Sequence, residues 1–154
     1  MYSIAFICSA NACRSPMAHA IFAAEAAKRK LPVRVVSAGT WDFGGMPAVR
    51  EAQLVCQRHH TPMTKLLSTH LTQVDLSQAT RIFCMERAHL TTLVEAGVPL
   101  DRIRLLGEFD PQQRGPEIDD PMGQNVEAFE QCYQRLRDCI VHYLNTTADF
   151  GAAS

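Results

Sequence analysis

Residues 4–16, which read IAFICSANACRSP, decide the fold of this chain. They begin with a short apolar run at residues 4–7, which is typical of a buried strand. They end at Ser15-Pro16, a pair typical of a helix start, with Ser as the cap and Pro in the first turn. A loop of small and polar residues lies between these two signals. In a strand–loop–helix of this kind, the N–H groups of the loop and the positive end of the helix dipole are directed at the same position. The stretch therefore predicts an anion-binding site.

The predicted loop carries a thiol at one end, Cys8, and a guanidinium at the other, Arg14. A helix N-terminus and a nearby cation favour the thiolate, which is the nucleophilic form of cysteine. The planar fork of Arg14 is suited to phosphoryl oxygens, which carry the charge of the transition state. Ser15 is placed to hydrogen-bond Cys8, and Asn11 is one of the few non-glycine residues that tolerate the positive φ of an inward-turned loop. These residues predict phosphoryl transfer to a cysteine.

The sequence CSANACRSP resembles the signature of the low-molecular-weight protein tyrosine phosphatases, Cys-x-Gly-Asn-x-Cys-Arg-Ser, with Ala10 in place of the glycine. The resemblance implies hydrolysis of phosphotyrosine through a phosphocysteine, with Cys8 as nucleophile and Arg14 holding the phosphate. If Ala10 needs a positive φ, it costs about 1 kcal/mol relative to glycine. Many family members pair the positions of Cys8 and Cys13 in a disulfide, which protects the nucleophile. The expected substrate-binding residues of the loop are Ser9, Ala10, Asn11, Ala12, Cys13 and Ser15.

A general acid is also required, because neither a thiolate nor an arginine supplies a proton to the leaving oxygen. Residues 107–124 are loop-like and contain Asp119-Asp120-Pro121-Met122. The family's acid lies in Asp-Pro-Tyr, so the resemblance assigns this role to Asp120, with Asp119 as the alternative. Met122 replaces the family's Tyr at the mouth of the cleft.

A second resemblance lies at residues 37–40, Ser-Ala-Gly-Thr, where the family's second strand ends. Trp41 and Phe43 follow in a glycine-rich loop and are candidate walls for a flat aryl substrate. By resemblance one of the two borders the cleft, while packing of Trp41 against the core is the alternative. Family members often carry a His near position 66 that supports the loop Asn, and this chain has Leu66 there.

The rest of the chain predicts strands alternating with helices, which favours a parallel sheet covered on both faces. We expect an α/β, three-layer fold with a small four-stranded parallel sheet and the phosphate-binding loop after the first strand. We expect one domain over residues 1–154, with a disordered tail at 146–154. The expected strands span residues 4–7, 33–36, 81–85 and 103–106. The expected helices span residues 16–30, 48–60, 86–96 and 123–145.

Composition restricts the partners. Hydrophobic residues make up 47% and charged residues 20% of the 154 residues, as in globular proteins. The net charge of -1 argues against a nucleic-acid partner. No apolar run approaches the ~20 residues that span a membrane, and the N-terminal run is too short for a signal peptide. We therefore expect a cytoplasmic enzyme, and we expect it to be a monomer or weak dimer. The family resemblance implies a phosphotyrosine-containing protein, such as a tyrosine kinase, as its substrate.

The remaining cysteines predict no metal site and no cofactor. Cys132 and Cys139 lie seven apart on a helical pattern and are expected in the core. Two alternative functions stay open. An arsenate reductase on the same fold needs relay thiols, but Cys84 lies in an expected strand and no cysteine follows it closely. A non-catalytic phosphotyrosine-binding module is the other alternative, although all three catalytic residue types are present.

Overall fold

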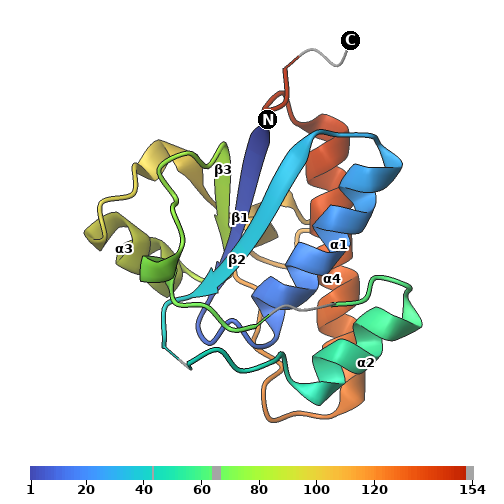
Figure 1. The fold of residues 1–154 in the computed structure, drawn as a ribbon. Coiled ribbons are helices and arrows are strands. Elements are labelled where there is room, and N and C mark those ends of the chain that lie inside the picture. Colours follow the sequence, from blue (N-terminus) through green and yellow to red (C-terminus); the bar gives the residue numbers. More distant parts are fainter. Residues whose placement is uncertain (43, 64–66, 152–154) are drawn as a thin grey trace.

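The computed structural model describes residues 1–42, 44–63 and 67–151. Its centre is a parallel sheet of four strands, as the sequence predicted, and the strand order is β2-β1-β3-β4 (Figure 1). The strands are β1 (Tyr2–Cys8), β2 (Val33–Gly39), β3 (Arg81–Cys84) and β4 (Ile103–Leu105). In the register of the sheet, Cys8 lies opposite Gly39, so the end of β1 and the end of β2 meet at one edge.

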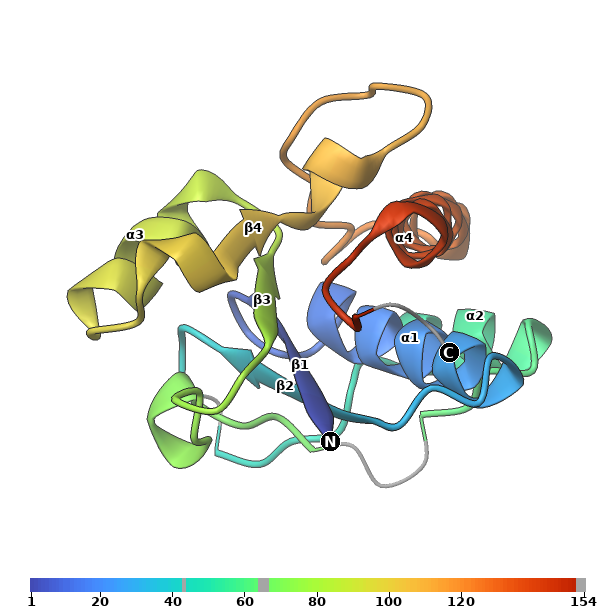
Figure 2. The ribbon, with the colours of Figure 1, turned by 90° about the horizontal axis from the view of Figure 1, so that it is seen from above.

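Helices cover both faces of the sheet, which makes the three layers seen from above in Figure 2. One face carries α1 (Arg14–Lys28), α2 (Arg50–Arg58) and α4 (Val126–Thr146), and the other carries α3 (Arg87–Glu95). Successive side chains of β1 point to opposite faces of the sheet, so both faces are apolar. Ile4 and Phe6 join the core cluster under α1 and α4, whereas Ala5 and Ile7 join the cluster on the side of α3. Short 3-10 turns complete the fold at η1 (Leu71–Gln73), η2 (Leu100–Arg102) and η3 (Leu106–Phe109).

Two element boundaries differ from the prediction in ways that matter for the site. Helix α1 begins at Arg14, and Ser15 lies inside it instead of capping it. The reason is that the Ser15 hydroxyl contacts Cys8 and Asn11 and is not available to the helix end. Strand β2 extends beyond the expected 33–36 to Gly39, because β1 pairs with it along its whole length.

The C-terminal residues after α4 pack against the sheet, whereas the sequence predicted disorder from residue 146. Both carboxylate oxygens of Asp149 accept from Arg81 of β3, at 2.9 and 3.0 Å. Tyr143 also donates to Asp149, and the Phe150 ring contacts the ring of Tyr2 at a centroid distance of 5.0 Å. These contacts order residues 147–151, while 152–154 lie outside the described part of the chain.

Across the described ranges, no helix is both long and apolar enough to cross a bilayer.

Candidate active site

The loop at residues 9–13 joins β1 to α1 and is closed by a hydrogen-bond chain that ends at Cys8. The N–H of Thr69 donates to Asn11 Oδ1 at 2.9 Å, and Asn11 Nδ2 donates to Ser15 Oγ at 2.7 Å. Because Ser15 Oγ accepts from Asn11, its own proton is free to donate to Cys8 Sγ, 2.9 Å away. The chain of hydrogen bonds therefore places a hydroxyl donor against the sulfur of Cys8, the expected nucleophile.

The positive φ of the loop lies at Asn11, with a value of 55°. Ala10 is not among the positive-φ residues of the described chain, so the replacement of the family's glycine does not cost the strain considered above. Ala10 is 9% exposed and Cys8 is 3% exposed, so the loop is closely packed on its inner side.

Arg14 brings two distant segments to the loop. Its side chain is almost fully buried, and Nη1 donates to the carbonyl of Ile118 at 2.6 Å. Its Nη2 donates to Glu86 Oε2 at 2.9 Å and lies 3.6 Å from Asp120 Oδ2. The structure therefore places the expected acid, Asp120, next to the expected phosphate-binding arginine.

Residues 110–122 form the loop that contains the expected acid, Asp120, and we call it the acid-bearing loop. Through Met122 it contacts the loop of residues 9–13, which we call the cysteine loop. The N–H of Met122 donates to Asp120 Oδ1 at 3.0 Å, which turns the carboxylate back onto its own loop. The sulfur atoms of Met122 and Cys13 are 3.8 Å apart. Burial raises the pKa of Cys13, and the negative charge of Asp120 acts in the same direction, so this thiol stays protonated in the structure.

The base of the acid-bearing loop is fixed by Asp110, whose carboxylate is fully enclosed. It accepts from Arg114 at 2.8 Å and from Arg135 of α4 at 3.0 Å. Arg135 also donates to the carbonyls of Gly115 and Glu117. Burial alone would raise the pKa of Asp110, but the hydrogen bonds from Arg114, Gln112 and Arg135 outweigh it and lower the pKa to about 2.

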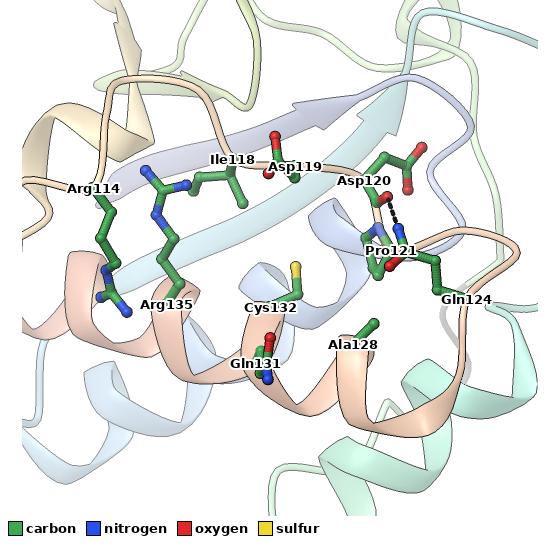
Figure 3. Close-up of a pocket in the computed structure, with 10 residues that line it drawn as sticks. All are labelled: Arg114, Ile118, Asp119, Asp120, Pro121, Gln124, Ala128, Gln131, Cys132 and Arg135. Carbon is green, nitrogen blue, oxygen red and sulfur yellow. Dashed lines mark hydrogen bonds between the residues drawn. The ribbon is translucent and has the colours of Figure 1, made fainter.

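A cavity of about 290 Å³ lies between the acid-bearing loop and α4 (Figure 3). The side chain of Cys132 points from α4 toward this loop, and Gln124 donates to the Asp120 carbonyl at 3.2 Å. Burial raises the pKa of Cys132 to about 12. The expected core position of Cys132 is confirmed, since it is 8% exposed.

Two expected substrate contacts lie at the surface beside the loop. Trp41 is 58% exposed and its N–H donates to the Ser9 carbonyl at 2.8 Å, so its ring is not buried in the core. Met122 is 42% exposed. Phe43 and Leu66 lie outside the described residues.

Sequence reasoning assigned no role in the site to Glu86, Gly39 or Thr69, although all three lie against site residues. Glu86 lies two residues after the end of β3, and the carboxyl ends of adjacent parallel strands meet at one edge of the sheet. This position is the signal that could have identified Glu86. Gly39 was noted only as part of the Ser-Ala-Gly-Thr resemblance. Thr69 contributes its backbone, which no residue type in the sequence reveals.

Within the ranges that the structure covers, no three His, Cys, Asp or Glu side chains are grouped so that they could hold a metal ion.

Comparison with known proteins gives a consistent result. The family model described as low molecular weight phosphotyrosine protein phosphatase matches residues 3–149. The low molecular weight phosphotyrosine protein phosphatase of Sus scrofa is 31% identical over 150 residues, which cover 92% of this chain and 93% of the relative.

Solved structures share the fold. The low molecular weight protein tyrosine phosphatase from T. tengcongensis matches with a TM-score of 0.86 and 26% identity, over 94% of this chain and 99% of that one. An arginine phosphatase from Geobacillus stearothermophilus matches with a TM-score of 0.81 and 28% identity, over 94% and 92% of the two chains.

Proposed function

Since this chain belongs to the low molecular weight phosphotyrosine protein phosphatase family of hydrolases, we propose that it hydrolyses phosphotyrosine in proteins through a phosphocysteine at Cys8. Two observations at the ends of the same loop support this assignment. The chain of hydrogen bonds from Thr69 ends at the Cys8 sulfur, and Arg14 lies against Asp120 at 3.6 Å.

In the first step the Cys8 thiolate attacks phosphorus in line with the phenolic oxygen. The S–P bond forms as the P–O bond breaks, and Asp120 gives its proton to the departing oxygen. Arg14 and the loop N–H groups hold the three other oxygens, where the charge of the transition state lies. Arg14 is already held by Glu86 and the Ile118 carbonyl, so it loses little side-chain entropy when phosphate binds.

In the second step a water molecule attacks the phosphocysteine. Asp120, now a carboxylate, takes the proton of this water, and the S–P bond breaks to release inorganic phosphate and the Cys8 thiolate. The Ser15 hydroxyl donates to the sulfur and stabilises the charge of this leaving group. Arg14 and the N–H groups of the cysteine loop form a phosphate cradle that supplies fixed positive charge to the phosphoryl oxygens. We therefore expect the reaction to need no metal ion.

The test is phenolate and phosphate release from an aryl phosphate in the presence of EDTA, for the wild type, Cys8→Ser and Asp120→Asn. We expect turnover by the wild type and none by Cys8→Ser. Asp120→Asn should be slowed most for substrates with poor leaving groups, because these depend most on the proton. Asp119→Asn is the matched control and should retain activity. A larger loss for Asp119→Asn than for Asp120→Asn would contradict the assignment of the acid.

The same assay separates the alternatives. A protein that binds the ester without releasing phosphate is a binding module, and one that is active only with arsenate and a thiol is a reductase. Against the reductase, all six cysteines are buried, and burial raises the pKa of Cys84 to about 12, which disfavours a relay thiolate. Phosphoarginine is included among the substrates of the assay, because one of the matching solved structures is an arginine phosphatase.

The finer assignments of substrate and location are also part of this proposal. We expect a phosphotyrosine-containing protein such as a tyrosine kinase as substrate, a cytoplasmic location, and a monomer or weak dimer in solution. The exposed Trp41 beside the loop supports a protein substrate with room for residues that flank the phosphotyrosine. Phosphate release from phosphotyrosine peptides, compared with a simple aryl phosphate, tests whether flanking residues contribute.

A further inference from the structure

His89 is a buried side chain that the mechanism above does not use. It lies in the first turn of α3 and is 2% exposed. The backbone N–H of Glu86 donates to its Nδ1 at 3.1 Å, and its Nε2 lies 2.9 Å from Ser9 Oγ. Because Nδ1 accepts a hydrogen bond, the proton of the neutral ring is on Nε2, which donates to Ser9.

The surroundings keep this ring neutral. Burial lowers the pKa of His89 to about 4, and the positive charge of Arg14 acts in the same direction. The negative charges of Glu86, Asp120 and Glu117 oppose this shift without overcoming it. Near neutral pH the two hydrogen bonds of His89 therefore have fixed directions.

We propose that His89 is a positioning residue of the phosphate site, which fixes Ser9 of the cysteine loop relative to Glu86, the partner of Arg14. This inference rests on the proposed function, because it concerns the geometry of the same site. Glu86 Oε2 is 2.9 Å from Arg14 Nη2 and 3.5 Å from His89 Nε2, so the ring lies between the arginine's partner and the loop.

Ser9 is the residue directly after the nucleophile, and it is held from two sides. The N–H of Trp41 donates to its carbonyl from the β2 side of the sheet, and His89 donates to its hydroxyl from the α3 side. The first of these bonds is backbone to backbone and survives most substitutions. The second depends on one imidazole, so substitution of His89 removes the support on the α3 side alone.

The experiment compares His89→Ala and His89→Gln in the full chain, by steady-state kinetics with an aryl phosphate and by the affinity for inorganic phosphate. The loss of one buried hydrogen bond predicts a decrease of about five- to tenfold in phosphate affinity and in kcat/KM for His89→Ala. His89→Gln places an amide N–H near the position of Nε2, so we expect it to recover most of this loss. His89→Asn is too short to reach Ser9 and should not recover it.

The matched control is His19→Gln. His19 Nδ1 lies 3.2 Å from Ser37 Oγ, and burial lowers the pKa of His19 to about 4, so it is a half-buried histidine–serine pair away from the loop. Its substitution should leave phosphate affinity unchanged.

The decisive measurement is a double-mutant cycle with Ser9→Ala. If His89 acts through Ser9, His89→Gln and His89→Ala will have equal phosphate affinities once Ser9 is alanine. If the difference between the two variants persists in that background, or if His19→Gln weakens phosphate as much as His89→Ala, the positioning role is refuted. If His89→Ala does not fold, the comparison of the Gln and Asn variants decides in the same way. A wild type that binds phosphate but does not turn over defeats the proposed function, while the phosphate affinities still decide this inference.

Discussion

Gly39 is the residue at which the structure makes its sharpest prediction. It ends β2 opposite Cys8, and its N–H donates to the Thr69 carbonyl at 2.8 Å. A Cβ added at Gly39 would lie 2.5 Å from the Ser9 carbonyl oxygen and 3.0 Å from Asn11 N. These neighbours are backbone atoms of the cysteine loop, so no side-chain rotation relieves the contact.

The magnitude follows from the size of this overlap. To restore a normal contact of about 3.5 Å, the loop in Gly39→Ala has to move by roughly 1 Å. Because a misplacement of this size at a reacting group costs on the order of 100-fold in rate, we expect kcat/KM to fall by about that factor. Phosphate affinity should fall as well, since the displaced residues are those of the cradle.

The assay is aryl phosphate hydrolysis, with thermal unfolding measured in parallel to show that the variant is folded. The control is Gly97→Ala, at a φ of 92° with no atom within 4 Å of the added Cβ. Gly97→Ala should lose about 1 kcal/mol of stability through backbone strain and keep its kcat/KM. If Gly39→Ala retains kcat/KM within about threefold of the wild type, the cysteine loop is not held against β2 and the reasoning fails.

Three further predictions concern stability. Asn11→Ala loses one buried and one partly buried hydrogen bond and places alanine at a φ of 55°, so the free energy of unfolding in urea should fall by about 2–4 kcal/mol. Asn11→Gly should lose less, and an equal loss would show that backbone strain is not involved. The pKa of Asp110 is lowered from 3.8 to about 2, so it contributes about 2 kcal/mol to the free energy of unfolding above pH 4, and this contribution is lost as the pH falls toward 2. Unfolding curves of Asp110→Asn should lack this part of the loss of stability in acid. An unchanged loss of stability in acid would contradict the prediction. Asp149→Ala leaves the guanidinium of Arg81 without its carboxylate, so the midpoint of thermal unfolding should fall by several degrees, whereas an unchanged midpoint would mean that the tail adds no stability.

The sequence predicted the sheet because short apolar runs alternated with helical patterns, and each run became a parallel strand. It also predicted the positive φ near Asn11, since few residue types tolerate that conformation. It did not predict the order of residues 147–151. The contacts of Asp149 depend on Arg81, and a pairing so distant in sequence leaves no periodic pattern.

The supports of the site were missed for a related reason. Thr69 acts through its backbone N–H, which every residue except proline carries. Glu86 and His89 act through side chains, but their meeting with Arg14 and Ser9 depends on how β1 and β3 lie side by side. A local motif reveals the residues of the loop itself, whereas the groups around it become visible only with the topology.

The strand order β2-β1-β3-β4 has one more consequence. The chain leaves β1 toward one edge of the sheet to form β2 and then returns to the other side to form β3, so the sheet changes its direction of winding at β1. The connections that follow these strands consequently diverge at the carboxyl end of β1, where open α/β sheets bind their ligands. Cys8 lies at this switch point. Gly39 at the end of β2 and Thr69 in the segment that follows β2 reach it on one side, and Glu86 and His89 reach it from the segment that follows β3 on the other. Changes in the connections of one half can thus reshape one wall of the site while the opposite wall keeps its geometry.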